Sequence, residues 1–415
     1  MAAARFAHSA IFGIFVAACA AVSTVAVAAD ESVIGESQTR RDLPTVTGPI
    51  PSDDRPVSGL VSQQYALEKL GVYDAWSVEV GDPSIVVAVI DSGVDSSHPD
   101  LSQRMWINPR ELANGVDDDG NGYIDDIRGW DFVQDDNNPQ DEADHGTHVA
   151  GIIAARGRFS DGVAGVANVT IMPLRVLDAQ RQGVDSDVAL AIDYAVKAGA
   201  HVINVSLGGP DSSAAMRNAC AAAERAGVVV VAAVGNQGGQ AVLYPAAYDS
   251  VLGIAAVDEN DVPAAFSNAS SAVDLAAPGV NILSTVLNQR YGFRNGTSMA
   301  TAYVAGIAAL LRTAHPDWTA AQIRAAIVDS ADDINVSGWD EKTGFGRANA
   351  YRALTDAGAD APLSDRGVNT APPLGSVAEP VTAGEQLAEL TPCGFGVLPG
   401  FAVSLLLLGA GRRMA

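Results

Sequence analysis

Three short segments of the chain carry side chains suited to nucleophilic catalysis. Asp91 follows the apolar run at residues 85–90, His145 opens the sequence His-Gly-Thr-His, and Ser298 lies within Gly-Thr-Ser-Met-Ala. A serine hydroxyl is a weak nucleophile until a neighbouring imidazole accepts its proton. The imidazole in turn needs a carboxylate that fixes its tautomer and stabilises its charged form. The chain order Asp, His, Ser is one of the few known for such a triad, so the three residues predict acyl transfer through a serine.

Each segment has a simpler interpretation when it is taken alone. An aspartate that closes an apolar run often forms a turn or caps a helix, and Gly-Thr-Ser is a common turn sequence. His-Gly-Thr-His is also compatible with a metal site or with the start of a helix. The catalytic interpretation therefore depends on the three segments together, each in glycine-rich surroundings that let a ligand or another backbone approach closely.

The elements that must position these residues alternate between strands and helices. Short, largely apolar runs, mostly rich in β-branched residues, predict buried strands. They are residues 85–90, 171–176, 202–205, 228–234 and 251–256. Between them, residues 186–198 and 212–226 have helical spacing behind capping serines. This alternation predicts an α/β fold, with a doubly wound, mostly parallel sheet and helices on both of its faces.

The predicted sheet accounts for where the three candidate residues stand. Asp91 lies at the carboxyl end of the first strand, where doubly wound folds build their sites. His145 begins one helical segment, and Ser298 begins another that runs to about Ala314. A serine at a helix N-terminus lies close to exposed backbone N–H groups, which favour developing negative charge.

Together the three segments resemble those of the subtilisin-like serine proteases, or subtilases, and in particular the thermitase-like branch. The resemblance runs from about Pro56 to Leu354. It implies the subtilisin-like fold and serine endopeptidase activity on protein or peptide substrates. In that mechanism Asp91 orients the imidazole, His145 acts as general base and then acid, and Ser298 attacks the scissile carbonyl group.

The resemblance also implies further residues around the nucleophile. Asn236, at the end of an apolar run, would supply a side-chain donor to the oxyanion hole. A peptide would lie as an added strand between residues 177–183 and a glycine-containing segment that follows another strand. That segment is Ser206, Leu207, Gly208 and Gly209. The floor of the specificity pocket is expected near residues 237–244, and because that stretch is uncharged we expect a broad, mainly apolar preference.

One departure from the family lies on the nucleophile helix. Subtilases usually carry a Pro-His pair four and five residues past the serine, where this chain has Ala302 and Tyr303. Loss of the proline removes a helix kink and bears on the aim of Ser298. The alternative to an active enzyme is a catalytically weak relative that acts as a surface protein-binding module. The intact triad and Asn236 favour the enzyme, either a general degrader or a processing protease.

A first acidic loop, residues 117–126, has the alternating oxygen ligands of an EF-hand-like calcium site. The candidate ligands are Asp117, Asp119, Asn121, Tyr123 and Asp125. The loop departs from the EF-hand at its twelfth position, where Arg128 replaces the bidentate Glu and where Asp125 or Asp126 would substitute. Acidic runs are often simply solvated, but the five acids of this loop repel each other unless a cation neutralises them.

A second acidic loop resembles a calcium site of the thermitase-like branch. Its candidate ligands are Asp131, Asp136, the Asn138 carbonyl group and Gln140. A third site of the family is expected to be lost, because the usual Asn after the His helix is absent from residues 156–160. Structural Ca²⁺ is therefore the expected cofactor.

The composition of the 415-residue chain limits its partners. A net charge of −24 and a pI near 4.4 argue against nucleic-acid binding, which needs basic surface to neutralise phosphates. We expect a monomer. Of three cysteines, Cys19 and Cys393 lie in terminal segments, and Cys220 is expected to be buried in a helix. A disulfide framework is therefore not expected.

Both ends of the chain predict export. Residues 1–29 have the basic, apolar and Ala-Val-Ala pattern of a signal peptide, and a lipobox-like Val-Ala-Ala-Cys ending at Cys19 is the lipoprotein alternative. Residues 30–56 form a linker or short pro-segment in place of a large prodomain, 57–356 the peptidase domain and 357–393 a flexible linker.

The segment 394–415 is apolar to residue 411 and then basic, which predicts either a membrane anchor or a sorting signal for a processing enzyme. We expect a protein attached to the cell envelope or surface, or released from it.

Overall fold

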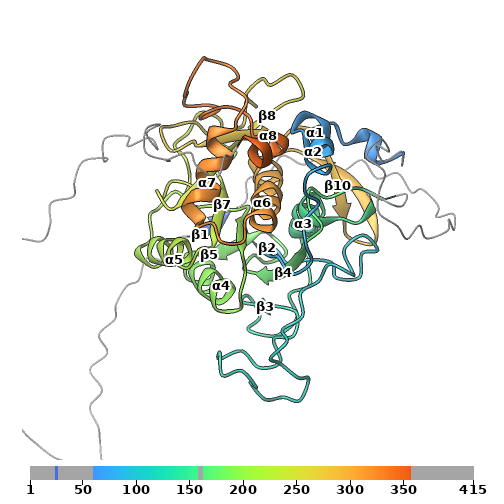
Figure 1. Ribbon diagram of the computed structural model, residues 1–415. Coiled ribbons are helices and arrows are strands. Elements are labelled where there is room, and N and C mark those ends of the chain that lie inside the picture. The colour runs from blue at the N-terminus through green and yellow to red at the C-terminus, as the bar shows by residue number, and fades with distance from the viewer. Residues whose placement is uncertain (1–23, 27–58, 158–161, 357–415) are drawn as a thin grey trace, which may run out of the picture. The chain divides into compact units, whose positions relative to one another are not determined.

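Seven parallel strands form the central sheet in a computed structural model that describes residues 24–26, 59–157 and 162–356 (Figure 1). The strands lie in the order β3-β4-β2-β6-β7-β8-β9, and each neighbouring pair is parallel. Their bounds are β2 Val86–Asp91, β3 Trp130–Asp131, β4 Thr170–Arg175, β6 Val202–Val205, β7 Val229–Ala233, β8 Val251–Val257 and β9 Leu275–Pro278. The five predicted strands are β2, β4, β6, β7 and β8. The predicted α/β class is confirmed.

Helices of the described residues cover both faces of this sheet. Their bounds are α1 Tyr65–Lys69, α2 Val72–Ala75, α3 Gly146–Ala154, α4 Asp185–Lys197, α5 Ala214–Arg225, α6 Thr297–Ala314, α7 Ala320–Asp329 and α8 Ala350–Thr355, with a 3-10 turn at Val61–Gln63. The predicted helices at 186–198 and 212–226 are α4 and α5. Ser213 caps α5 by accepting a hydrogen bond from the Met216 N–H.

Alternate side chains of β2 pack into two separate cores. Val87 and Val89 belong to the core that contains α3 and α6, whereas Ala88 and Ile90 belong to the core that contains α4 and α5. Figure 1 shows α4 and α5 together on one side of the sheet and α6 on the other. The strand is buried on both faces, which explains its continuous apolar sequence.

The chain order reverses beside β2, because β4 lies on one side of it and β6 on the other. The carboxyl end of β2 is therefore a topological switch point, where open α/β sheets form binding crevices. Asp91 is the last residue of this strand.

Two small antiparallel pairs lie outside the main sheet. β10 (Ile282–Val286) and β11 (Arg290–Arg294) form a hairpin just before α6. The short strand β5 (Gln182–Val184) pairs with β1 (Thr24–Ala26). The edge of β5 thus pairs with an extended segment of the same chain.

Several predicted segments lie outside the described residues. These are the signal peptide apart from β1, residues 30–56, the linker 357–393, the apolar segment 394–415, and Cys19 and Cys393. Among the helices of the described ranges, none has the length and apolar character needed to cross a membrane. Cys220 is a free, buried thiol on α5, as predicted.

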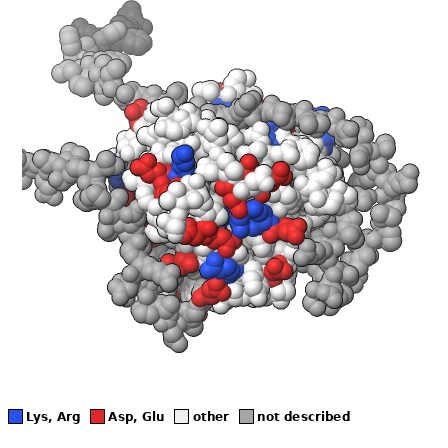
Figure 2. Space-filling model, turned by 90° about the horizontal axis from the view of Figure 1, so that it is seen from above, with Lys and Arg blue, Asp and Glu red and all other residues white. Residues whose placement is uncertain are grey.

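The face of the molecule in Figure 2 carries acidic side chains with a few basic ones among them, in keeping with the net charge of −24. Some charged side chains of the described residues form ion pairs: Asp332 contacts Arg347 at 2.7 Å and Arg352 at 3.1 Å. Such partly exposed pairs contribute little individually to stability.

Candidate active site

The structure brings Asp91 and His145 into direct contact. Asp91 ends β2, and His145 is the N-cap residue of α3. His145 Nδ1 lies 2.7 Å from Asp91 Oδ1, and both side chains are fully buried. The backbone N–H of Ser92 donates to the same oxygen at 2.7 Å. A carboxylate at Nδ1 favours the tautomer with a proton on that nitrogen, which leaves Nε2 as a proton acceptor.

Ser298 stands in the first turn of α6, behind Gly296 with φ 154°. Its hydroxyl group donates to the Ser206 carbonyl oxygen at 3.1 Å, and the Ser206 hydroxyl donates to the Ser298 carbonyl at the same distance. Within the described part of the chain, His145 Nε2 has no hydrogen-bond partner. Ser298 and His145 thus lie in separate hydrogen-bond arrangements. This is compatible with their predicted roles, because catalytic hydrogen bonds often tighten only in the complex with substrate.

Asn236 is held by the residue before the nucleophile. Its side-chain oxygen accepts hydrogen bonds from the N–H and the hydroxyl of Thr297, at 2.9 and 2.8 Å. An oxygen fixed in this way directs the amide NH₂ group to the opposite side of the carboxamide.

A shallow pocket joins the predicted substrate residues to the nucleophile. It is lined by Ser206, Leu207, Gly208, Ala233, Gly235, Asn236, Gln237, Leu243, Thr297 and Ser298, all uncharged. Gly209 is not among them; its N–H and carbonyl groups pair with the backbone of Tyr244 at 3.0 and 2.9 Å.

Sequence reasoning missed Asn268, which shapes the loop beside this pocket. Its side chain donates to Gln237 Oε1 at 2.7 Å and accepts from the Gln237 N–H at 2.8 Å. The Asn268 N–H donates to the Gly235 carbonyl group at 3.0 Å. A side-chain Cβ at Gly235 would lie 2.5 Å from the Asn268 amide nitrogen, so this close approach requires glycine.

His148, the second histidine of His-Gly-Thr-His, has a structural position. Its Nε2 lies 3.1 Å from the carbonyl oxygens of both Ile282 and Gly292. Burial and the charge of Arg294 hold the pKa of His148 well below its usual range, so the ring is neutral. The side chain ties α3 to the β10–β11 hairpin. Neither histidine belongs to the one potential metal-binding group found in the described ranges.

That group consists of Glu111, Asp117 and Asp119, whose carboxylate oxygens lie within 4.8 Å of one another. Glu111 is only 6% exposed. Its Oε1 accepts from the N–H groups of Asp118 and Asp119 at 2.8 and 2.9 Å, and its Oε2 has no partner in the described part of the molecule. Sequence reasoning missed Glu111 because it precedes the EF-hand-like run; an acid six residues before Asp117 was the only signal.

In the first loop, the side chains of Asn121 and Asp125 make hydrogen bonds outside the group of Glu111, Asp117 and Asp119. Asn121 donates to the buried Asp126 at 2.8 Å and accepts from the N–H of Tyr123 at 2.8 Å. Asp125, with φ 55°, accepts hydrogen bonds from the N–H groups of Asn114 and Gly115 at 3.0 Å. Asp126 therefore faces the inside of the loop and Asp125 caps a neighbouring turn.

In the second acidic loop, Asp131 already has a cationic partner. Its carboxylate pairs with the buried Arg175 at 2.7 Å. The pKa of Asp131 is raised above its usual value, because burial outweighs the lowering by hydrogen bonds from Gln134 and Val133 and by the charge of Arg175. Asp136 accepts from the Asn138 N–H at 2.9 Å, and the Asn138 carbonyl accepts from the Gln140 N–H at 2.7 Å. Calcium in this loop stays a prediction.

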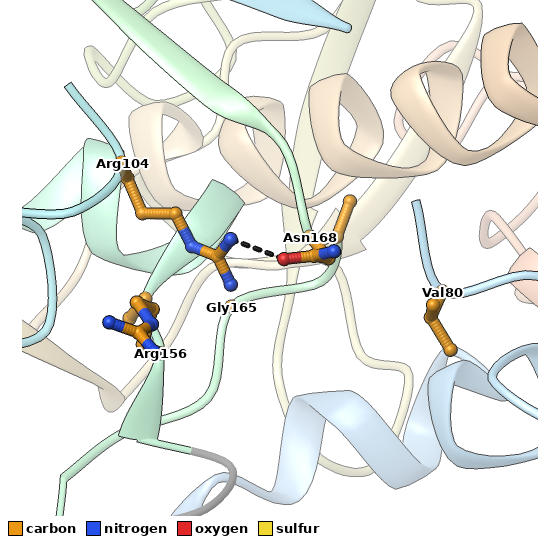
Figure 3. Close-up of a pocket in the computed structure, with 7 residues that line it drawn as sticks. Val80, Arg104, Arg156, Gly165 and Asn168 are labelled. Atoms are coloured by element: carbon orange, nitrogen blue, oxygen red, sulfur yellow. Dashed lines mark hydrogen bonds between the residues drawn. The ribbon is translucent and has the colours of Figure 1, made fainter. Parts of the chain in front are cut away.

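Another cavity, of about 110 Å³, lies away from these residues (Figure 3). It is lined by Val80, Arg104, Ala155, Arg156, Gly165, Ala167 and Asn168. The Arg104 guanidinium donates to the Asn168 side chain, as Figure 3 shows, and to the Ala154 carbonyl group. No predicted site residue lines this cavity.

The departure at Ala302 and Tyr303 leaves the nucleophile helix continuous. Both side chains are buried within α6, which runs without interruption to Ala314. Burial raises the pKa of the Tyr303 hydroxyl well above its usual range, so the phenol is neutral.

Comparison with known proteins identifies close relatives of this chain. A family model described as the subtilase family matches residues 82–346. Thermitase of Thermoactinomyces vulgaris is 40% identical over 296 residues, which are 71% of this chain and 96% of thermitase. The thermophilic serine proteinase of Bacillus sp. (strain AK1) is 42% identical over 70% of this chain and 67% of its own length. The halolysin-like extracellular serine protease Nep of Natrialba magadii is 38% identical over 72% of this chain and 53% of its own.

Proposed function

This chain belongs to the subtilase family as a thermitase-like serine-type endopeptidase, and from that premise we propose that Asp91, His145 and Ser298 hydrolyse the peptide bond. The buried 2.7 Å contact between Asp91 and His145 carries the proposal. Nε2 of His145 takes the proton of the Ser298 hydroxyl as the oxygen attacks the carbonyl carbon. The imidazolium, stabilised by Asp91, then gives that proton to the leaving amine, which leaves Ser298 acylated. Water, deprotonated by the same imidazole, attacks the acyl group, and the proton returns to the Ser298 oxygen as the acid leaves.

Asn236 stabilises the oxyanion of the tetrahedral intermediate in this mechanism. Thr297 holds the side-chain oxygen of Asn236, so the amide NH₂ group serves as donor. The backbone N–H of Ser298, in the first turn of α6, is the second donor, and the helix N-terminus adds to the local positive potential.

The substrate lies in extended form beside Leu207 and Gly208. These residues share a pocket with Ser298 and Asn236, and the uncharged lining favours apolar side chains of the substrate. β5 is the opposite rim. Its edge pairs with β1, which belongs to the proposed signal peptide and would be removed with it, so a substrate strand could take that place. Gly209 plays no direct part, because Tyr244 already pairs with its backbone.

We further propose a structural Ca²⁺ held by Glu111, Asp117 and Asp119. The donor set matches the ion in kind, since carboxylate oxygens are the ligands that Ca²⁺ prefers; Asp119 also pairs with Arg110 at 3.1 Å, so the ion would share this ligand. The buried Glu111 Oε2, which no described residue satisfies, supports cation binding here because buried carboxylate oxygens are costly without a partner. The predicted second ion, at Asp131 and Asp136, competes with Arg175 for its ligands.

The location of the enzyme is also a proposal. One relative is named as extracellular, and residues 1–29 have the pattern of a signal peptide. We therefore propose an exported enzyme that acts outside the cytoplasm. Residues 394–415 would either anchor it or serve a sorting enzyme.

Fluorophosphonate labelling of the purified protein in calcium tests the triad. The wild type should label, and Ser298→Ala should not label while its kcat falls by about 10⁶, the cost of removing the nucleophile in subtilisin. Ser102→Ala, which changes an exposed serine, is the matched control and should behave as wild type. A wild type that fails to label, or a Ser298→Ala variant that still does, would contradict the proposal and favour the protein-binding alternative.

A further inference from the structure

The carboxylate of Asp141 lies between the two elements that carry the contact of Asp91 with His145. Asp141 precedes α3 and is only 4% exposed. Its two oxygen atoms accept hydrogen bonds from three backbone N–H groups and two hydroxyl groups. The donors are the Ser92 hydroxyl, the Ala143, Asp144 and Thr147 N–H groups, and the Thr147 hydroxyl. A buried carboxylate with this many donors is fixed in one orientation.

One side of the Asp141 carboxylate reaches the strand that ends in Asp91. Oδ1 accepts the Ser92 hydroxyl at 2.8 Å. Ser92 directly follows Asp91, and its N–H donates at 2.7 Å to Asp91 Oδ1, the oxygen that contacts His145. A single residue therefore separates Asp141 from the acid of the triad.

The other side of the carboxylate holds the first turn of α3. Oδ2 accepts from the N–H and the hydroxyl of Thr147, at 2.9 and 2.6 Å. The Gly146 N–H donates to the Ser92 hydroxyl oxygen at 3.0 Å, which closes a loop of hydrogen bonds between the strand and the helix. Gly146 directly follows His145, so any shift of this turn moves the imidazole.

Tight packing restricts the same junction. A Cβ added at Gly146 would lie 2.1 Å from the carbonyl oxygen of Gly93 and 3.1 Å from Asp91 Cβ. The helix start and the strand end thus touch through their backbones, and the polar groups of Ser92, Asp141 and Thr147 set their register.

We propose that Asp141 is a positioning residue for catalysis, which fixes Asp91 and His145 relative to each other by holding Ser92 with one oxygen and the first turn of α3 with the other. The proposal rests on the triad proposed above. Misplacement of a catalytic group by about 1 Å can cost about 100-fold in rate, so loss of this carboxylate should lower kcat far more than it changes KM.

A purely structural helix cap would give a different result, and the chain offers a matched control. Asp340 accepts hydrogen bonds from the Lys342 N–H at 2.8 Å and from the Thr343 N–H at 3.1 Å, and also contacts the Thr343 hydroxyl group. This is the same local motif, far along the chain from the triad. Asp340→Ala should therefore lower stability, by less than Asp141→Ala because Asp340 is more exposed, and should leave kcat unchanged.

The experiment measures kcat and KM of the full chain for Asp141→Ala and Asp340→Ala, below the melting temperature of each variant. Each substitution is made both in the wild type and in Asp91→Ala. Asp141→Ala should lower kcat about 10- to 100-fold in the wild type with KM nearly constant, and should have little effect once Asp91 is gone. Equal losses in both backgrounds, no loss in the wild type, or an equal loss in Asp340→Ala would overturn the inference.

Two further variants keep the test decisive. Ser92→Ala removes the link between Asp141 and the strand but leaves the hydrogen bonds of α3, so it applies even when Asp141→Ala does not fold. It should lower kcat about 10-fold, and an unchanged kcat would contradict the proposal. Asp91→Ala alone distinguishes a failure of the proposed triad from a failure of the role proposed for Asp141. If this variant keeps the wild-type kcat, the triad assignment is wrong, and the inference on Asp141 fails with it.

Discussion

The triad region and the first acidic loop position their carboxylates in opposite ways. Asp91 lies at the end of a strand buried on both faces, and its partners are a histidine at a helix start and a backbone N–H. Glu111, Asp117 and Asp119 lie in a segment without helix or strand, where carboxylates face one another. The first region gets its geometry from packed secondary structure. In the second, Arg110 lies 3.1 Å from Asp119, and we propose that a bound ion supplies further positive charge.

This difference predicts that substitutions in one region lower activity and substitutions in the other lower stability. In the proposed mechanism Asp91, His145, Asn236 and Ser298 act on the transition state, so their substitution should lower kcat far more than it lowers stability. In the proposed calcium site the groups of the loop stabilise the folded state by holding an ion. A ligand that binds only the folded form adds stability according to its concentration over its Kd. Activity should therefore report on one region and thermal stability on the other.

The largest effect expected from this comparison concerns Asn236. Asn236→Asp keeps the oxygen that accepts from Thr297 but replaces the NH₂ donor, so kcat should fall by about 10²–10³ with KM nearly unchanged. The melting temperature and its response to chelator should stay as in the wild type. Steady-state kinetics and scanning calorimetry check both. If kcat changes only slightly, Asn236 is not a donor of the oxyanion hole.

Asn236→Ala supplies the control for that variant. It removes the hydrogen bonds to Thr297 as well, and their loss should cost about 1 kcal/mol of stability. If only this variant loses activity, Asn236 acts by holding the segment before Ser298 and donates nothing to the oxyanion.

The next effect concerns calcium and should appear in stability alone. At a calcium concentration 100 times Kd, a bound ion contributes about 2.7 kcal/mol, so EDTA should lower the melting temperature by about 5 °C. Glu111→Gln should lower it similarly in calcium and leave little further response to EDTA. Initial rates at 25 °C should be unchanged.

Glu259→Gln is the matched control for the loss of one negative charge, because Glu259 is exposed and lies outside the acidic loops. It should keep the full response to EDTA. A wild type whose melting temperature ignores EDTA would contradict the calcium site. An EDTA response that Glu111→Gln keeps in full would instead place the ion elsewhere, with the second acidic loop as the first alternative.

The two regions also differ in how far the sequence predicts them. A continuous apolar run, rich in β-branched residues, predicts the strand that carries Asp91, and the predicted sheet then places Asp91 at the end of that strand. Glu111 and Asp141 give no such signal. Their contacts depend on where a loop folds back: Glu111 lies near Asp117, and Asp141 accepts a hydrogen bond from Ser92. No local periodicity encodes those contacts.

Helix α6, which carries Ser298, shows both what the sequence predicts and what it does not. The absence of proline at Ala302 correctly indicates a helix without a proline kink, and α6 is continuous. The sequence could not show that Tyr303 fills a buried position in that helix, because the volume available there is set by the neighbouring elements.

The smallest expected effect tests the sequence-based ligand Asp125 against the fold. Its carboxylate caps the turn at Asn114 and Gly115, so Asp125→Asn should cost about 1 kcal/mol or less of stability and change calcium affinity only slightly. Calcium titration followed by calorimetry measures both quantities, with Asp117→Asn as the comparison that should lose affinity strongly. If Asp125→Asn weakens calcium binding as much as Asp117→Asn does, the loop closes around the ion with Asp125 as a ligand. The EF-hand spacing would then describe the calcium-bound loop better than the hydrogen bonds seen here. The acidic loop would then change its conformation when it binds the ion, whereas the region of Asp91 and His145 is fixed by packed secondary structure.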